Sequence, residues 1–246
     1  MRLFFAITLP EEARERLARI QSLLRESVGR EGVRWEDPAK FHITLRFLGS
    51  VEPERVEAVK EAGRDAASAC APFSLRLGAP GAFPKSGPAR VLWVGAESGL
   101  PEYARLAEYL EGRLIGHGFA GSSEAHASSR TGQQPRPHIT IARAKTPRGS
   151  DAIRRALREN NLNKVDKEGV ISVYNVVLFH SDLRPGDRST LFWKPSRSPH
   201  LETVLIPPLL PRQPGKRRIK PFPRSQICIA LRDAQRNSAG VRAGEE

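Results

Sequence analysis

Apolar positions in the first seventy residues form two runs that are typical of strands and twice follow the period of a helix. Apolar runs at residues 2–9 and 41–48 predict two strands. After Pro10, and again over residues 53–69, apolar residues recur every three or four positions, which predicts two amphipathic helices. The residues expected to face the core are Ala13, Leu17, Ile20 and Leu24 in the first helix, and Val56, Val59, Ala62 and Ala66 in the second.

The same order of strand, helix, strand and helix begins again after residues 72–88, where Pro and Gly residues indicate turns. Strands are predicted at 90–95 and 138–142, one helix begins at Pro101, and a second covers about 150–160. The chain therefore has the pattern of a duplication. The residues that the helix after Pro101 should bury are Tyr103, Leu106, Leu110 and Leu114.

A duplicated order of this kind predicts an α+β fold with two interleaved lobes. Each lobe would be an antiparallel sheet with helices on its outer face, and a central groove would lie between the sheets. A last strand at 170–180 and a short hairpin through 184–193 would complete this body, so we expect one two-lobed domain over residues 1–193. Within it, residues 121–137 are rich in Ser, Gly, Gln and Pro, which predicts a long loop.

Positive charge and proline are concentrated in the C-terminal part. Residues 194–246 hold 11 of the 40 Lys and Arg residues, 4 of the 27 Asp and Glu residues and 8 of the 20 prolines. They show no sustained period of 2 or 3.6, so we expect this basic tail to be mostly disordered. The net charge of +13 favours a polyanionic partner, with nucleic acid ahead of a membrane.

Cysteine content and hydropathy indicate the cellular setting. Cys70 and Cys228 are too few and too far apart for a disulfide framework or a zinc site, which favours a reducing compartment. No run approaches the roughly 20 apolar residues of a membrane span, and the first apolar run is too short for a secretory signal. We therefore expect a cytoplasmic protein without membrane contacts, and a monomer.

The pattern His-x-Thr-x occurs once in each half, at His42 and Thr44 and at His138 and Thr140. Because strand side chains alternate between faces, each His and Thr should project to one side, with the intervening Ile in the core. If an approximate two-fold axis relates the halves, the central groove receives two imidazoles and two hydroxyl groups. This is a geometry for acid–base chemistry.

Two histidines suit displacement at phosphorus, since a neutral imidazole can accept a proton from the nucleophile while an imidazolium gives one to the leaving oxygen. The threonine hydroxyls can donate to phosphate oxygens. Arg46, which shares strand parity with His42, is one candidate for phosphate binding. Arg143 is another, but its parity is opposite to that of His138, so it needs a strand end or a bulge to reach the groove. By the same rule, Phe47 should face the core instead of a nucleobase.

We expect no metal and no cofactor. A zinc site at His42 and His138 would have no Cys, Asp or Glu at ligand spacing near either motif, whereas zinc sites generally use three or four protein ligands. The other histidines have no counterpart in the opposite half, so surface or structural positions are expected for His117, His126, His180 and His200.

Around the motifs the sequence resembles the two-histidine (2H) phosphoesterase superfamily, and within it the RNA 2′,3′-cyclic phosphodiesterases of bacteria and archaea, once described as 2′-5′ RNA ligases. The resemblance covers about residues 1–185. It implies hydrolysis of a ribose 2′,3′-cyclic phosphate to a 2′-phosphomonoester, with His42 as acid to the 3′ leaving oxygen, His138 as base for water, and an Arg at the place of Arg143. The stretches that carry the resemblance are 2–7, 33–35, 41–49, 81–84, 90–95 and 137–143.

The partner implied is an RNA 3′ end, or a nucleotide, that carries a 2′,3′-cyclic phosphate. Two alternatives remain open. The same site could run in reverse and join a cyclic phosphate to a 5′-hydroxyl group, or the chain could be a non-catalytic RNA-binding module. Replacing His42 or His138 by Ala would separate catalysis from binding, because acid–base groups contribute about 10²- to 10⁴-fold to the rate and little to ground-state affinity.

Overall fold

The computed structural model describes residues 1–29, 31–121, 136–159 and 169–180. Its strands are β1 (Arg2–Thr8), β2 (Val33–Trp35), β3 (His42–Ser50), β4 (Phe73–Phe83), β5 (Val91–Ser98), β6 (His138–Ala144), β7 (Val170–Val173) and β8 (Val177–His180). They form two antiparallel sheets, one in the order β3-β1-β8 and the other in the order β2-β6-β5-β4-β7. The predicted hairpin and basic tail, and most of the predicted loop, lie outside the described residues, so the division into residues 1–193 and 194–246 stays a prediction.

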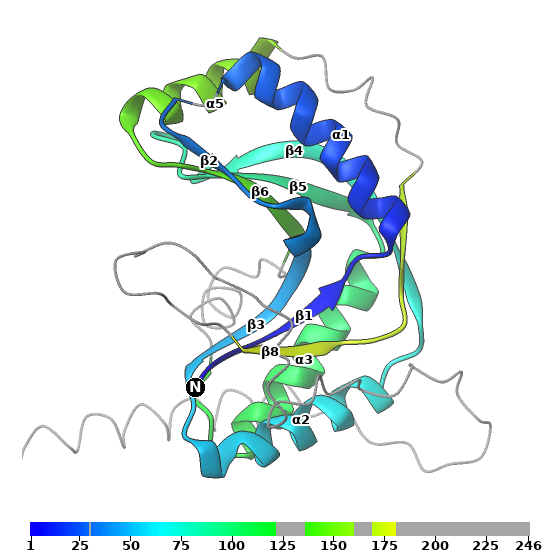
Figure 1. Ribbon diagram of the computed structural model, residues 1–246. Coiled ribbons are helices and arrows are strands. Elements are labelled where there is room, and N and C mark those ends of the chain that lie inside the picture. The colour runs from blue at the N-terminus through cyan, green and yellow to red at the C-terminus, as the bar shows by residue number, and fades with distance from the viewer. Residues whose placement is uncertain (30, 122–135, 160–168, 181–246) are drawn as a thin grey trace, which may run out of the picture.

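Two pairs of helices cover the sheets. The helices are α1 (Glu11–Val28), α2 (Val56–Ser68), α3 (Leu100–Gly116) and α5 (Pro147–Glu159), with short 3-10 turns at Pro38–Lys40 and Pro53–Arg55. Helix α1 packs with α5 on the five-stranded sheet, and α2 packs with α3 on the three-stranded sheet. Figure 1 shows the two pairs on opposite sides of the molecule, with the sheets between them. The α+β fold with two lobes and outer helices is therefore confirmed.

The periodic apolar residues of the helices belong to one large hydrophobic core. Every predicted core-facing residue of α1 and α3 is buried, and so are Val59, Ala62 and Ala66 of α2, while Val56 is partly buried. The two lobes are interleaved because each sheet is covered by a helix from the other half of the chain. Helix α1, from the first half, lies on the five-stranded sheet, which is built mainly from the second half. Helix α3, from the second half, lies on the three-stranded sheet, which is built mainly from the first. Among the described residues, no helix is both long and apolar enough to cross a membrane.

The single last strand predicted at 170–180 is wrong, because the chain changes sheet in the middle of it. Strand β7 pairs with β4, and β8 pairs with β1. Between them Tyr174 is exposed, and Asn175 Oδ1 accepts a hydrogen bond of 3.3 Å from Thr8 Oγ1. An apolar run of this length does not itself indicate which sheet each half joins.

The turns predicted at 72–88 are also wrong in part, since β4 occupies most of that stretch and lies inside the five-stranded sheet. Pro80 is one of the Pro and Gly residues that indicated turns in this stretch, and a proline cannot donate to a sheet ladder. The register between β4 and β5 shifts between Leu77 and Pro80, and proline is tolerated at such an irregularity. The three-residue strand β2 was too short to predict from its pattern.

Candidate active site

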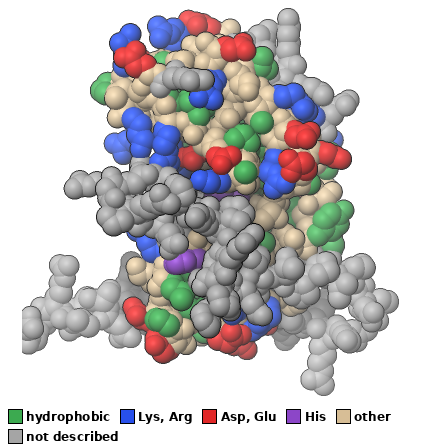
Figure 2. Space-filling model, in the orientation of Figure 1, with side chains coloured by type: hydrophobic (Ala, Val, Ile, Leu, Met, Phe, Trp, Pro, Cys, Tyr) green, Lys and Arg blue, Asp and Glu red, His purple; other side chains and the backbone are tan. Residues whose placement is uncertain are grey.

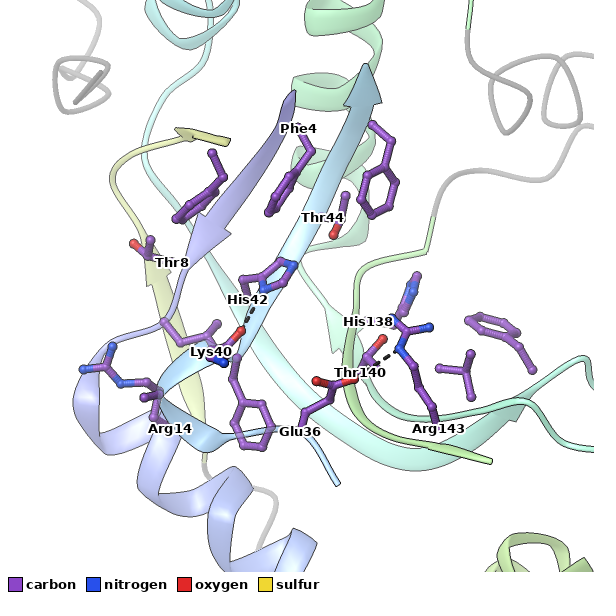
Figure 3. Close-up of a pocket in the computed structure, with 17 residues that line it drawn as sticks. Phe4, Thr8, Arg14, Glu36, Lys40, His42, Thr44, His138, Thr140 and Arg143 are labelled. Atoms are coloured by element: carbon purple, nitrogen blue, oxygen red, sulfur yellow. Dashed lines mark hydrogen bonds and ion pairs between the residues drawn. The ribbon is translucent and has the colours of Figure 1, made fainter. Parts of the chain in front are cut away.

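The two histidines of the repeated motif lie in one pocket, on strands from different sheets. His42 is the first residue of β3 in the three-stranded sheet, and His138 is the first residue of β6 in the five-stranded sheet. Both line the pocket together with Thr44 and Thr140. In Figure 3, His42 and His138 approach the same space from opposite sides. The groove expected from the duplication is therefore present, with both motifs in it.

Each imidazole is held by the carbonyl oxygen two residues before it. His42 Nδ1 lies 2.7 Å from the Lys40 carbonyl oxygen, and His138 Nδ1 lies 3.1 Å from that of Arg136. A ring nitrogen that faces a carbonyl oxygen carries a proton and donates it, so proton exchange is left to Nε2 in both rings. The two motifs therefore hold both imidazoles in the same tautomer, with the proton on Nδ1.

Both motif strands carry a β-bulge three residues after the histidine. In the β1–β3 pair, Ala6 is opposite Thr44 and Phe5 is opposite Arg46, which leaves Leu45 as the extra residue. In the β5–β6 pair, the register likewise shifts and leaves Ile141 without a partner. A bulge lets two successive residues face the same side, so the alternation of faces is reversed beyond it.

The bulge at Ile141 brings Arg143 into the pocket. Ile141 and Ala142 are both buried, so the next side chain, that of Arg143, is on the same side as His138 and Thr140. Its Nε donates to Glu36 Oε1 at 3.1 Å, and this oxygen also accepts from Arg34 Nη2 at 3.1 Å. Figure 3 shows the contact between Arg143 and Glu36 at the edge of the pocket. The parity objection to Arg143 is therefore removed.

Arg46 does not enter the pocket, contrary to the expectation from strand parity. The bulge at Leu45 turns it to the face covered by α3, where its Nε donates to Glu111 Oε2 at 2.6 Å. The side chains of Arg46 and Glu111 are only 10% and 12% exposed. Arg46 is thus part of a largely buried ion pair and does not line the pocket.

Phe47 lines the pocket, so the prediction that it faces the core is wrong for the same reason. Its side chain is 45% exposed, and its ring centroid lies 5.5 Å from that of Phe4. Phe4 in turn stacks on Phe179 of β8 at 5.2 Å. Phe47, Phe4 and Phe179 make an aromatic wall on the three-stranded sheet beside His42, and sequence reasoning missed it because the bulge depends on pairing with a distant strand.

The aromatic wall sets the electrostatics of His42. Phe4 and Phe179 lie 5.3 and 6.2 Å from the imidazole. Burial lowers the pKa of His42 below its ordinary value of 6.5, and the hydrogen bond to the Lys40 carbonyl and the charge of Glu36 oppose this only in part. The neutral form of His42 is therefore favoured more than in a freely exposed histidine.

His138 is packed by different aromatic rings. Phe83 meets its imidazole edge-on at 5.1 Å, and Trp93 lies behind them, 5.0 Å from Phe83. The indole of Trp93 lies against Gly81, where a Cβ atom would come within 2.4 Å of it. A glycine is therefore required at position 81 for Trp93 to support the Phe83–His138 contact.

Charged side chains on the visible outer face are mixed. In Figure 2, Lys and Arg are interspersed with Asp and Glu over the lobe of the five-stranded sheet. Within the pocket, by contrast, the cations Arg14, Lys40 and Arg143 are accompanied by the single carboxylate of Glu36 among the described residues. The excess of positive charge among these residues therefore suits the binding of a phosphate group in the pocket.

Comparison with known proteins agrees with this geometry. A family model described as LigT-like phosphoesterase matches residues 7–93. A protein of Methanothermobacter thermautotrophicus named RNA 2′,3′-cyclic phosphodiesterase is 30% identical over 186 residues, which are 75% of this chain and 92% of that protein. The chain belongs to the LigT-like phosphoesterase family.

Other relatives of this LigT-like chain extend the agreement. An RNA 2′,3′-cyclic phosphodiesterase of Thermus thermophilus is 37% identical over 150 residues, 60% of this chain and 70% of that protein. The crystal structure of TT0787 of Thermus thermophilus matches with a TM-score of 0.55 at 30% identity, over 75% of this chain and 91% of that one. The crystal structure of E. coli LigT complexed with 3′-AMP matches with a TM-score of 0.54 at 26% identity, over 75% of this chain and 90% of that one.

Proposed function

We propose that this LigT-like phosphoesterase hydrolyses 2′,3′-cyclic phosphates, at RNA 3′ ends or on nucleotides, to 2′-phosphomonoesters by acid–base catalysis between His42 and His138. The observation that carries the proposal is the pair of imidazoles, each anchored through Nδ1, that present Nε2 to one pocket from opposite sheets. Relatives named for hydrolysis of RNA 2′,3′-cyclic phosphates support the direction of the reaction, and nothing found favours end joining.

The base in this reaction is His138. Neutral Nε2 takes a proton from a water molecule as its oxygen attacks phosphorus, in line with the bond to the 3′ oxygen. The hydrogen bond from Nδ1 to the Arg136 carbonyl stabilises the imidazolium that forms.

The acid is His42, whose protonated Nε2 gives its proton to the 3′ oxygen as the bond from phosphorus to that oxygen breaks. Burial lowers the pKa of His42 and so works against this protonated form. A phosphodiester anion beside the imidazole favours the charged form and so raises the pKa again. The substrate itself therefore helps to prepare the acid.

Charge on the non-bridging phosphate oxygens is stabilised by hydroxyl groups and a guanidinium group. Thr44 and Thr140 stand one on each motif strand, two residues after the histidines, where their hydroxyls can donate to these oxygens. Glu36 accepts from Nε of Arg143, which leaves the two Nη groups to contact phosphate. Proton transfer and charge stabilisation are thus supplied by side chains, so the mechanism we propose needs no metal.

The aromatic wall supports a nucleoside as the remainder of the substrate. Phe47 is partly exposed in the pocket, and any of the four nucleobases can stack on an aromatic ring. The structure of E. coli LigT complexed with 3′-AMP shows that a relative accepts a nucleotide, which agrees with this choice.

The test is to incubate the protein, in the presence of EDTA, with a short RNA that ends in a 2′,3′-cyclic phosphate. The product is read by its mass and by its resistance to a 3′-specific phosphatase. Wild type should add one water and form a 2′-phosphate, while His138→Ala should lose about 10²- to 10⁴-fold in rate. His117→Ala is the matched control, because His117 caps the end of α3 and does not line the pocket.

Three results would contradict the proposal. A folded wild type that binds the RNA without hydrolysing it would favour the RNA-binding module. Turnover abolished by EDTA and restored by a divalent cation would contradict metal-independent catalysis. An equal loss in His117→Ala and His138→Ala would show that the loss does not report on the pocket.

A further inference from the structure

Gln21 is a polar side chain in the core-facing stripe of α1. It is 6% exposed and lies between Leu17 and Leu24, which are fully buried. A buried amide is costly unless its donors and acceptor find partners. Gln21 Nε2 donates to the carbonyl oxygen of Glu36 at 2.7 Å and to that of Ile141 at 2.9 Å. Both protons of the amide group are therefore used on two backbone carbonyls that are distant in sequence.

These two carbonyls belong to the residues that orient Arg143. Glu36 holds the guanidinium group through its carboxylate, and Ile141 is the extra residue of the bulge that turns Arg143 into the pocket. The backbone N–H of Glu36 also donates to the Ile141 carbonyl, at 3.0 Å. Gln21, Glu36 and the bulge therefore meet at a single oxygen atom.

We infer that Gln21 is a positioning residue for Arg143. By joining the bulge of β6 to the segment that carries Glu36, it fixes the base of the Arg143 side chain and the carboxylate that aims its guanidinium group. This inference rests on the proposed function, in which Arg143 stabilises charge on the phosphate oxygens. Gln21 does not line the pocket, so its effect on the reaction is indirect, and we assign it to the position of Arg143.

The effect of losing Gln21 follows from the reaction. Charge on the non-bridging oxygens is larger in the transition state and in the dianionic 2′-phosphate product than in the cyclic diester. A displaced guanidinium group therefore lowers kcat more than it raises KM, and it weakens binding of the product. A displacement of about 1 Å can cost on the order of 100-fold, so we expect Gln21→Met to lower kcat by about 10- to 100-fold.

The experiment compares Gln21→Met with Leu24→Ala on adenosine 2′,3′-cyclic phosphate. Methionine keeps the length of the side chain but has no N–H donor. Leu24→Ala removes a fully buried side chain from the same helix face without touching the bonds to Glu36 and Ile141. It should lower the melting temperature at least as much as Gln21→Met, yet leave kcat of the folded protein within about 3-fold of wild type.

A double-mutant cycle tests the route through Arg143. In an Arg143→Met background, the further change Gln21→Met should reduce kcat by less than about 2-fold, because the group that it positions is gone. The same cycle is measured on the dissociation constant of adenosine 2′-monophosphate by calorimetry, which needs no turnover. For kcat and for the dissociation constant alike, the loss in the double variant should be smaller than the sum of the losses in the two single variants.

Two outcomes would overturn the inference. One is a Gln21→Met protein that loses stability like Leu24→Ala but keeps its kcat and its affinity for the monophosphate. The other is a full additional loss in the Arg143→Met background, which would place the effect elsewhere. Failure of the proposed function is seen separately, as a wild type that does not hydrolyse the cyclic phosphate, and the binding cycle then still decides the role of Gln21.

Discussion

Phe47 and Arg143 occupy equivalent positions in the two halves of the molecule. Each follows its motif histidine by five residues, and each side chain lines the pocket because a bulge, at Leu45 or at Ile141, reverses the alternation of the strand. The duplication thus repeats the same β-bulge in both halves, and each half uses it to place a different side chain in the pocket. One half presents an aromatic ring and the other a cation, which suits a nucleoside on the side of β3 and phosphate charge on the side of β6.

Replacing Phe47 by Ala should weaken binding of the nucleoside. Stacking of a base on an aromatic side chain is worth about 1–3 kcal/mol, so KM for adenosine 2′,3′-cyclic phosphate should rise about 5-fold or more, with little change in kcat. The control is ribose 2′,3′-cyclic phosphate, which has no base and should show no such change. An equal rise in KM for both substrates would contradict a stacking role for Phe47.

Removing either motif hydroxyl should slow the reaction. Hydrogen bonds to charged groups contribute about 1.5–3 kcal/mol, so Thr44→Val and Thr140→Val should each lower kcat/KM by about 10- to 100-fold. Thr8→Val is a matched control, because Thr8 also lines the pocket but its hydroxyl donates to Asn175. A loss in Thr8→Val as large as in the motif variants would show that the measurement reports on general damage to the pocket.

Arg46 should matter for stability and not for turnover. Arg46→Met leaves Glu111 largely buried without its cation, which should cost about 3 kcal/mol in the free energy of unfolding measured in urea. The double variant Arg46→Met with Glu111→Leu should recover most of that loss, since no unpaired charge remains. The kcat/KM of both proteins should stay near that of wild type. A loss of kcat/KM without a loss of stability would contradict this structural role and support the prediction from strand parity that Arg46 binds the substrate.

The sequence was sufficient to predict that the histidines and threonines of the two motifs meet in one pocket. The histidines and threonines were placed correctly because they precede the bulges, where strict alternation still holds. Beyond the bulges the same rule gave the wrong face for Arg46 and Phe47. A bulge arises from pairing between strands far apart in sequence, so periodicity along one strand does not detect it.

Other errors have the same origin. The break between β7 and β8 depends on which sheet each segment joins, and the run from Val170 to His180 carries no signal of it. Gln21 could have been noticed as a polar residue in the apolar stripe of α1. Its partners, Glu36 and Ile141, could not, because both bonds go to backbone carbonyls that the pattern of side chains does not reveal.

The central claim is that His42 and His138 have opposite duties, and the pH dependence of kcat/KM in single variants tests this most directly. Wild type should give a bell-shaped profile, because one imidazole must be protonated and the other neutral. His42→Ala retains only the requirement for a neutral base, so its residual rate should rise with pH to a plateau. His138→Ala retains only the acid, so its residual rate should fall as pH rises.

Burial of His42 fixes where that fall occurs. Because its pKa is lowered, kcat/KM of His138→Ala should already be declining below pH 6.5. The profile of kcat, which reports the complex with the phosphate anion, should decline at higher pH. Opposite slopes in the two variants, with the fall in His138→Ala, are the result that we predict. Profiles that slope in the same direction, or that exchange their slopes, would contradict the assignment of acid and base.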